Sequence, residues 1–337
     1  MRAQDNDVLL DVRHLSVDFP VRGSSLFAKK QIISAVSDAS FDIKKGETFG
    51  LVGESGCGKT TLANAILGLV EIRGGSVIFR GKELNKLAKS EFLEQRRSMQ
   101  MIFQDPYSSL NPRFDAFRII AEPLVIRGGF SREETRDRVV RLLELIGLSK
   151  DDMHRYPSAF SGGQKQRLGI ARAIALHPEL LICDEPVSAL DVSVHAQILN
   201  LLTDLQHELN LTYLFISHNL AVVKRICSTL AVMYLGKIVE YGQTEAIFRN
   251  PLHPYTRALI SAVLDIDIAR PWGRIILKGE TPSPINPPVG CRFAQRCYES
   301  GQHCACTPVE LVEVEPNHSV VCHKYAQLAS TVKNCAH

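Results

Sequence analysis

Apolar and polar positions alternate near the start of the chain as they do in strands. Residues 8–19, VLLDVRHLSVDF, predict a strand, and the polar, glycine-containing stretch 22–31 predicts a loop or hairpin. Residues 47–52, ETFGLV, predict a short apolar strand, and residues 59–70 have helical spacing. The glycine-rich residues 53–58 therefore lie between a strand and a helix.

The middle of the chain alternates helices with strands. Ser131 and Glu134 form a capping box before an apolar helical pattern that ends at Gly147. The elements that follow are a helix over 163–176, the strand LLICD (180–184), a helix near 193–209, the strand TYLFIS (212–217) and two short strands near 230–240. Such alternation predicts an α/β fold with a mainly parallel sheet. Residues 96–160, where only MQMIF resembles a strand, predict a helical insert.

The character of the sequence changes near residue 250. The segments NPLHPY (250–255) and ETPSPINPPVG (280–290) are rich in proline and predict non-helical chain. Six of the nine cysteines lie from Cys291 onward. We therefore predict one domain over residues 1–250, with its core at about 1–95 and 161–250 and the helical insert at about 96–160, and an irregular, cysteine-rich extension over 251–337.

Composition and charge narrow the class of protein. The 337 residues are 45% hydrophobic and 22% charged, with a net charge of +3, so there is no electrostatic case for a nucleic-acid partner or an anionic membrane. No run of eighteen apolar residues spans a bilayer, and the first twelve residues lack the apolar stretch of a signal peptide. We expect a cytoplasmic chain that docks on a membrane protein. In that compartment the clustered cysteines favour a metal or cluster over disulfides.

A phosphate-binding motif occupies the predicted glycine-rich turn. The residues Gly53, Glu54, Ser55, Gly56, Cys57, Gly58, Lys59 and Thr60 fit G-x-x-x-x-G-K-[ST] without mismatch. Backbone N–H groups of such a loop surround phosphate oxygens, and the helix start adds its positive dipole end. We expect Lys59 to reach the β- and γ-phosphates of ATP, the Thr60 hydroxyl to ligate Mg²⁺, and Thr61 to belong to the same binding set. The strand before and the helix after disfavour a chance glycine loop.

Two carboxylates follow the strand LLICD. Asp184 is expected to hold Mg²⁺ through its water shell, and Glu185 to polarise the attacking water as general base. A strand followed by a solvated acidic turn is the alternative, which the presence of the phosphate-binding motif in the same chain disfavours.

The segment Ser161-Gly162-Gly163-Gln164 and the KQRLGIARAI that follows it resemble the signature motif of ABC-type ATPases, which have a phosphate-loop NTPase fold with a RecA-like core. A serine hydroxyl and glycine amides at a helix start form an anion site, and Ser161 caps that helix under either interpretation. The resemblance implies that this motif caps the γ-phosphate of ATP held by a second subunit.

Further motifs fall in the order of that family. The resemblance implies that Gln104, after MQMIF, senses Mg²⁺ and the γ-phosphate, and that the loop 188–191, ending at Asp191, crosses the dimer interface. It also implies that His218 contacts the γ-phosphate and orients water. Asn219 departs from the aspartate that is usual at its position.

An aromatic side chain early in the chain stacks on adenine in the family. Phe19 is our candidate and Phe27 the second, although a phenylalanine buried in the core is an interpretation of nearly equal weight.

Several segments resemble the ATPases of bacterial dipeptide and oligopeptide importers: NPLHPYTRAL (250–259), GETPSPINPPVGCRF (279–293), QDPYSSLNPR (104–113) and EPVSALDVSV (185–194). The resemblance implies an ATPase at the cytoplasmic face of the membrane. Its partners are a second homologous ATPase subunit, two transmembrane permease subunits and an extracytoplasmic substrate-binding protein. Import of nickel, glutathione or another small cargo is the alternative. A soluble ABC ATPase of translation or DNA repair is a remote one, because the chain has one nucleotide domain and no long insertion.

The cysteine-rich tail offers four thiolates on irregular backbone: Cys291, Cys297, Cys304 and Cys322. Soft ligands of this kind suit a [4Fe–4S] cluster, and some peptide-importer ATPases carry one with this spacing. Zinc is the runner-up, because three histidines lie close by in the sequence: His303, His318 and His323. A reduced tail without metal is the third interpretation. Cys306 and Cys335 are spare.

Overall fold

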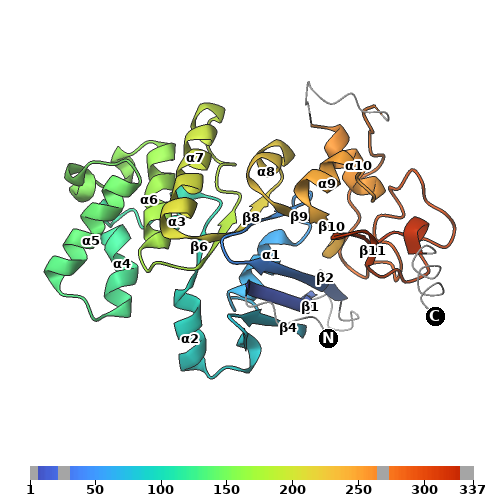
Figure 1. Ribbon diagram of the computed structural model, residues 1–337, viewed down its shortest axis with the longest axis horizontal. Helices are drawn as coiled ribbons and strands as arrows, with labels where there is room; N and C mark the ends of the chain where they lie inside the picture. Colours follow the sequence, from blue (N-terminus) through green and yellow to red (C-terminus); the bar gives the residue numbers. More distant parts are fainter. Residues whose placement is uncertain (1–6, 22–30, 264–272, 327–337) are drawn as a thin grey trace. The chain divides into compact units, whose positions relative to one another are not determined.

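The computed structural model describes residues 7–21, 31–263 and 273–326 (Figure 1). Phe27, Cys335 and most of the predicted loop 22–31 lie outside these residues. Contacts divide the chain into two compact units, which we describe separately. The first contains the chain up to Leu9, Lys44–Glu47 and Lys86–Phe215, and the second contains Leu10–Ile43, Thr48–Asn85 and the chain from Ile216 onward. The boundary predicted near residue 250 stays a prediction.

The strands of the first unit form a parallel arrangement, as the alternation of elements predicted. β6 (Met99–Ile102) pairs in parallel with β7 (Leu180–Asp184), and β8 (Thr212–Ser217) is the other neighbour of β7. Every residue of β7 and β8 is buried. Continuous burial of this kind explains why both strands appear in the sequence as unbroken apolar runs.

The described residues of the first unit also form several helices. They are α2 (Lys89–Arg97), α3 (Pro106–Ser109), α4 (Ala116–Arg127), α5 (Arg132–Leu145), α6 (Gly162–Ile174) and α7 (Val192–Leu209), with 3-10 turns at Lys150–His154 and Pro157–Ala159. The helices α4, α5 and α6 lie side by side (Figure 1). The predicted capping box of α5 is confirmed, since Ser131 Oγ accepts the Glu134 N–H and the Glu134 carboxylate accepts the Ser131 N–H. Gly147, with φ of +73°, follows its last turn.

The second unit contains two sheets. In one, β3 (Thr48–Val52) runs parallel to β9 (Thr229–Tyr234), which pairs antiparallel with β10 (Lys237–Gln243). In the other, the strand order is β2 (Gln31–Lys44), β1 (Val8–Val21), β4 (Gly74–Phe79) and β5 (Lys82–Glu83), with β1 and β4 antiparallel. Three helices belong to this unit before residue 250: α1 (Lys59–Ile66), α8 (Leu220–Ile226) and α9 (Thr244–Arg249). A 3-10 turn at Leu84–Lys86 lies at the boundary between the units.

The extension after residue 250 contains more regular structure than its prolines predicted. The helix α10 (Pro254–Ser261) overturns the non-helical prediction there, because Pro254 occupies its first turn, where no N–H is needed, and His253 caps it. A hairpin of β11 (Val312–Glu315) and β12 (His318–Val320) adds to the sheet through β12, which pairs with β10. The extension is therefore partly a continuation of the β10 sheet.

An aromatic cluster packs the extension against β9. Tyr234, Tyr255 and Phe293 are fully buried, and their ring centroids lie 4.7 to 5.3 Å apart. Such contacts between large rings stabilise a segment that has little core of its own.

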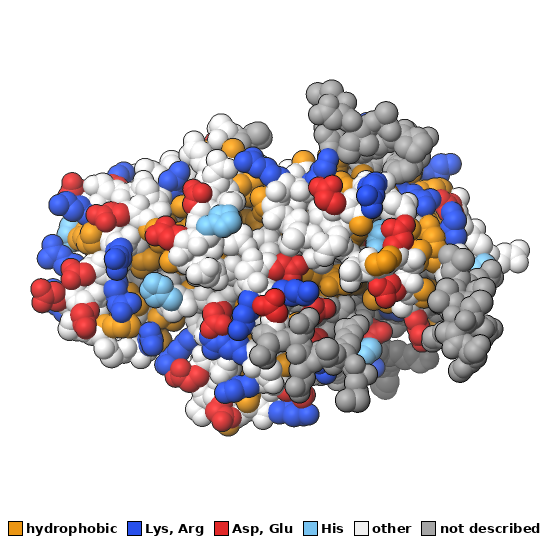
Figure 2. All heavy atoms as spheres, in the orientation of Figure 1, with side chains coloured by type: hydrophobic (Ala, Val, Ile, Leu, Met, Phe, Trp, Pro, Cys, Tyr) orange, Lys and Arg blue, Asp and Glu red, His pale blue; other side chains and the backbone are white. Residues whose placement is uncertain are grey.

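Among the described residues, no helix combines the length and the apolar character that crossing a bilayer requires. On the face drawn in Figure 2, basic and acidic side chains are interspersed over the helices of residues 86–215. That face therefore presents no large patch of a single sign.

Candidate nucleotide site

The glycine-rich loop lies between β3 and α1, as the sequence predicted. Gly56 and Gly58 adopt φ of +75° and +107°, in the left-handed region that favours glycine. A Cβ at Gly53 would lie 2.1 Å from the Met233 carbonyl oxygen, and one at Gly58 would lie 2.2 Å from that of Ala35. The loop can therefore take this tight path only with glycine at these positions.

Lys59 is the first residue of α1 and points back into the loop. Its side chain is 5% exposed, and its Nζ donates to the carbonyl oxygens of Gly53 at 2.9 Å and Glu54 at 3.0 Å. The first N–H groups of a helix have no partner within the helix, so they and the ammonium together favour an anion at this point. Burial raises the pKa of the neighbouring Cys57 thiol, which therefore stays neutral at physiological pH.

The carboxylates of the first unit follow β7. Asp184 is 3% exposed at the end of the strand. Glu185 adopts φ of +47°, an unusual conformation for a residue with a side chain, and such strain is concentrated at functional sites. Its Oε2 accepts a hydrogen bond from Gln104 Nε2 at 3.0 Å. The fold thus brings Gln104 and Glu185 together, although they lie 81 residues apart.

The serine-glycine segment caps α6. Ser161 N–H donates to Gln164 Oε1 at 3.0 Å, and Ser161 Oγ accepts the Gln164 N–H at 3.4 Å, so the predicted cap is confirmed. Gly162 and Gly163 form the first turn, where a Cβ on Gly163 would lie 2.6 Å from a Val194 methyl group. Any side chain at Gly163 would therefore clash with Val194 in the first turn of α6.

Three other predicted residues lie next to or within regular elements: Asp191, His218 and Phe19. Asp191 precedes α7, and its exposed carboxylate makes no capping bond to that helix. His218 is exposed just after β8, and Phe19 is 39% exposed on β1. Asn219 accepts the N–H groups of α8 at 3.1 and 3.3 Å, so it caps the helix as an aspartate would. The roles of Asp191, His218 and Phe19 towards ATP stay predictions.

The predicted residues are divided between the two units. The phosphate-binding loop, His218 and Phe19 belong to the second unit, whereas Gln104, Asp184, Glu185, Ser161 and Asp191 belong to the first.

The phosphate-binding loop also contacts residues that the sequence did not single out. Tyr255 Oη accepts the Glu54 N–H at 2.9 Å, and the Glu54 carboxylate forms an ion pair with Arg296 at 2.9 Å. No sequence signal links these residues, because more than 200 positions separate them. The partners of Glu54 are found only in the fold.

The cysteine-rich segment brings Cys291 and Cys304 together, since the Cys291 N–H donates to the Cys304 carbonyl oxygen at 2.7 Å. Burial is the main cause that raises the pKa of Cys291, and the thiols of Cys322 and Cys304 raise it further. Burial likewise raises the pKa of Cys297 to about 11, and Cys291 and Cys322 contribute. No group of three or more His, Cys, Asp or Glu side chains among the described residues is placed to hold a single metal ion.

The chain has a glycine loop between a buried strand and a helix, a strand that ends in two carboxylates, and a helix that begins with a serine cap and two glycines. These features are those of the nucleotide-binding domain of an ABC transporter. Comparison with known families agrees: residues 36–188 match the ABC transporter family. Residues 239–304 match the family described as "Oligopeptide/dipeptide transporter, C-terminal region".

Curated relatives extend this similarity over nearly the whole chain. The "Putative oligopeptide transport ATP-binding protein YkfD" of Bacillus subtilis is 48% identical over 94% of this chain and 95% of its own. The "Oligopeptide transport ATP-binding protein OppF" of Escherichia coli is 49% identical over 94% and 96%. The chain belongs to the family of oligopeptide transport ATP-binding proteins of ABC transporters.

Solved structures of ABC cassettes share the fold. The ATP-binding cassette MJ0796, described as a dimer in a post-hydrolysis state bound to ADP and Pi, has a TM-score of 0.62 and 28% identity, covering 70% of this chain and 99% of its own. The cbiO1 protein of Clostridium perfringens has a TM-score of 0.62 and 25% identity, covering 72% and 92%.

Proposed function

We propose that this chain binds and hydrolyses MgATP to power an importer of oligopeptides. The observation that carries the proposal is the near-full-length identity of 47 to 49% to oligopeptide transport ATP-binding proteins of several bacteria. The match of residues 239–304 to the oligopeptide and dipeptide C-terminal region supports the peptide cargo, because this region lies outside the general ABC match.

The loop around Lys59 is the proposed site of the phosphates. The backbone N–H groups of residues 53–58 and the start of α1 bind the β- and γ-phosphates, Lys59 leaves its carbonyl partners for the γ-phosphate, and Thr61 completes the set. Phe19 stacks on the adenine. The buried position of Lys59 and its bonds to the loop carbonyls support this role, since the ammonium already faces into the loop.

Thr60, Gln104 and Asp184 are the proposed residues that hold Mg²⁺, which when bound neutralises charge on the phosphates. Oxygen donors of these types suit that ion, and the burial of Asp184 at the end of β7 supports its assignment.

Glu185 is the proposed general base. It takes a proton from the attacking water, while His218 contacts the γ-phosphate and orients that water. The bond from Gln104 to Glu185 supports this assignment, because it holds the carboxylate at a defined point.

Catalysis in this proposal belongs to a pair of ATPase subunits. The Ser161-capped helix start, with Gly162, Gly163 and Gln164, binds the γ-phosphate held by the second homologous subunit, and Asp191 lies in the interface. Two permease subunits and an extracytoplasmic substrate-binding protein complete the complex, with this chain at the cytoplasmic face of the membrane. The dimeric structure of the cassette MJ0796 supports the pairing of two ATPase subunits.

Replacing Glu185 by glutamine in the reconstituted transporter tests the assignment of the base. The expected result is retained ATP binding with hydrolysis reduced by about 100-fold or more, since a positioned base contributes about 10² to 10⁴. The matched control is Glu208→Gln, which changes an exposed glutamate of α7. Hydrolysis that is unchanged in Glu185→Gln would refute the assignment.

The cargo is tested by transport. The reconstituted complex is supplied with labelled oligopeptides, dipeptides, nickel and glutathione, and uptake is measured with and without ATP. ATP-dependent uptake of peptides alone supports the proposal, and uptake of nickel or glutathione without peptide refutes it.

We also propose that Cys291, Cys297, Cys304 and Cys322 hold a [4Fe–4S] cluster. The four residues are only partly exposed, and the Cys291 N–H donates to the Cys304 carbonyl oxygen at 2.7 Å, which brings two of them together. When bound, the cluster would cross-link irregular segments of the extension. Anaerobic purification should give a brown protein with about four iron and four sulfide per chain. A colourless protein, or one that contains zinc, would overturn this proposal.

A further inference from the structure

Glu54, the second residue of the phosphate-binding loop, is held by three residues of the C-terminal extension. Tyr255 Oη accepts its N–H at 2.9 Å, and its Oε2 accepts hydrogen bonds from Arg296 Nη1 at 2.9 Å and Thr281 Oγ1 at 2.7 Å. These partners lie 201, 242 and 227 residues further along the chain. The extension thus contacts the loop through both the backbone and the side chain of one residue.

The contact is poorly hydrated. Tyr255 is fully buried, and the side chain of Arg296 is 10% exposed against 27% for Glu54. An ion pair that is mostly withdrawn from water is screened less than one at the surface, so its loss has a larger effect. The ion pair between Arg296 and Glu54 is therefore suited to fix the position of Glu54 in the loop.

Packing holds the partners of Glu54 in place. The Tyr255 ring lies 4.7 Å from Tyr234 and 5.3 Å from Phe293, and Tyr234 Oη accepts a further bond from Arg296 at 3.4 Å. These rings come from α10, β9 and the cysteine-rich segment. Tyr255 and Arg296 therefore cannot move away from Glu54 without repacking large side chains.

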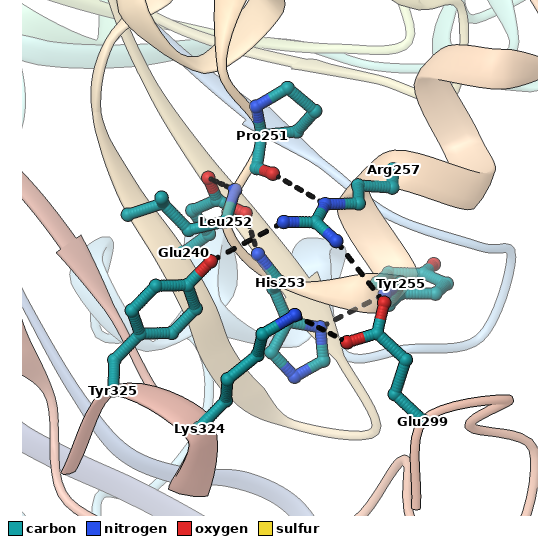
Figure 3. A network of polar contacts seen from close by, with 9 residues as sticks. All are labelled: Glu240, Pro251, Leu252, His253, Tyr255, Arg257, Glu299, Lys324 and Tyr325. Atoms are coloured by element: carbon teal, nitrogen blue, oxygen red, sulfur yellow. Dashed lines mark hydrogen bonds and ion pairs between the residues drawn. The ribbon is translucent and has the colours of Figure 1, made fainter. Parts of the chain in front are cut away.

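A network of polar contacts anchors the segment that carries Tyr255 (Figure 3). Glu240 accepts the N–H groups of Leu252 and His253, each at 2.8 Å, and Arg257 donates to the Pro251 carbonyl at 2.8 Å. The start of α10 is therefore fixed to β10.

The position of Glu54 bears directly on Lys59. The Glu54 carbonyl oxygen accepts a bond from Lys59 Nζ at 3.0 Å, so the residue held by the extension also holds the lysine of the phosphate site. A free carboxylate beside this loop would repel a polyphosphate, whereas the Arg296 guanidinium compensates its charge.

A second arginine of the extension reaches the same loop indirectly. Arg292 donates to the Leu235 carbonyl and, at 2.6 Å, to Ser37 Oγ. The adjoining Gly236 N–H donates to the Cys57 carbonyl at 2.8 Å. The turn between β9 and β10 is thus held against the loop by the same cysteine-rich segment.

We propose that Arg296 and Tyr255 are positioning residues for ATP, which hold Glu54 and through it the phosphate-binding loop. This rests on the proposed function, namely that the loop binds ATP. The C-terminal extension then sets nucleotide affinity in addition to any role in cargo transport.

The affinity of the purified full-length chain for MgATP tests the proposal, measured by calorimetry. Arg296→Gln should weaken binding by about tenfold, as expected for the loss of one bond between charged groups. Glu54→Gln keeps an oxygen that can accept the bond from Arg296 and should weaken binding less than Arg296→Gln. The double variant should bind no more tightly than Arg296→Gln, because it lacks the guanidinium that holds residue 54. Equal binding by Arg296→Gln and the unchanged chain would overturn the proposal. A double variant that binds as tightly as Glu54→Gln would overturn it too, because charge neutralisation alone would then explain the effect.

Steady-state hydrolysis by the assembled transporter gives an independent readout. Arg296→Gln and Tyr255→Phe should raise KM for ATP and leave kcat within about twofold, as expected when ground-state binding alone is lost. Arg296→Lys, which keeps the charge, should restore most of the affinity. A fall in kcat without a change in KM would contradict a positioning role.

Two controls separate this proposal from the function on which it rests. Lys324→Gln removes another ion pair of the extension, with Glu299, and should leave MgATP affinity unchanged. Lys59→Ala should abolish binding. If the unchanged chain fails to bind MgATP, the proposed function fails. The other outcome is that the unchanged chain binds MgATP, Lys59→Ala does not, and Arg296→Gln and Tyr255→Phe bind as well as the unchanged chain. In that case only the positioning role of Arg296 and Tyr255 is refuted.

Discussion

Replacing Glu240 by alanine removes the acceptor on which the start of the extension depends. Glu240 is fully buried in β10, and its carboxylate accepts the N–H groups of Leu252 and His253 and a hydrogen bond from His318 Nε2, each at 2.8 Å. Three segments, β10, the chain before α10 and β12, therefore meet at one side chain. The alanine variant leaves all three donors without this acceptor.

The magnitude follows from the number of donors. Each buried donor left without a partner costs about 1–3 kcal/mol, so the two backbone groups and the imidazole together should destabilise the extension by about 3 kcal/mol or more. This corresponds to a roughly 150-fold larger population of the locally opened state.

Hydrogen exchange followed by mass spectrometry measures this opening directly. Peptides that cover residues 250–257 should lose protection by about two orders of magnitude in Glu240→Ala, with a smaller effect in peptides of the first unit. Urea unfolding monitored by circular dichroism gives the change in global stability.

Glu299→Ala is the matched control, a glutamate of the same network that is 29% exposed and pairs with Arg257 and Lys324 (Figure 3). Exposed pairs contribute about 0–1 kcal/mol, so its effect should be small. Equal protection of residues 250–257 in Glu240→Ala and in the unchanged chain would refute the reasoning.

Two further predictions concern pH and packing. Burial, the larger cause, and the nearby Arg257 hold the pKa of His253 at about 3, below its ordinary value of 6.5, so the unfolded chain binds a proton that the folded chain excludes. The free energy of unfolding should therefore fall as pH drops from about 6.5 towards 3, by at most about 1.4 kcal/mol per pH unit from this group. His253→Asn, which keeps the cap of α10 but does not titrate, should reduce that slope in urea titrations at several pH values; an identical slope would contradict the assignment. Gly163→Ala should lower the melting temperature, because its Cβ would lie 2.6 Å from Val194, at a cost of about 1–3 kcal/mol. A Cβ at Gly169 in the same helix meets no atom within 4 Å, so Gly169→Ala should stabilise the protein by about 0.5–1 kcal/mol and raise the melting temperature. A higher melting temperature for Gly163→Ala than for Gly169→Ala in calorimetry would show the packing argument to be wrong.

Local pattern explains which elements the sequence predicted well. The helix α5 carries its own start signal in Ser131 and Glu134 and its own stop in Gly147, and both act within a few residues. The strands β7 and β8 each contain a run of four consecutive apolar residues, 180–183 and 213–216, because they are fully buried, so they too can be predicted directly from the sequence. The helix α10 is not evident from the sequence because proline usually breaks helices, whereas Pro254 stands in the first turn, where it is tolerated.

The phosphate-binding loop marks the boundary between what sequence and structure each decide. The motif from Gly53 to Thr60 predicts a phosphate site by itself, since its glycines, its lysine and its hydroxyl lie within a few consecutive residues. Its fixation by Tyr255, Thr281 and Arg296 could come only from the tertiary structure, because side chains more than 200 residues apart leave no local pattern. The pairing of Gln104 with Glu185 belongs to the same kind of information. A site formed by residues that are neighbours in the chain can be predicted from the sequence. The contacts that position those residues form only when distant segments pack together.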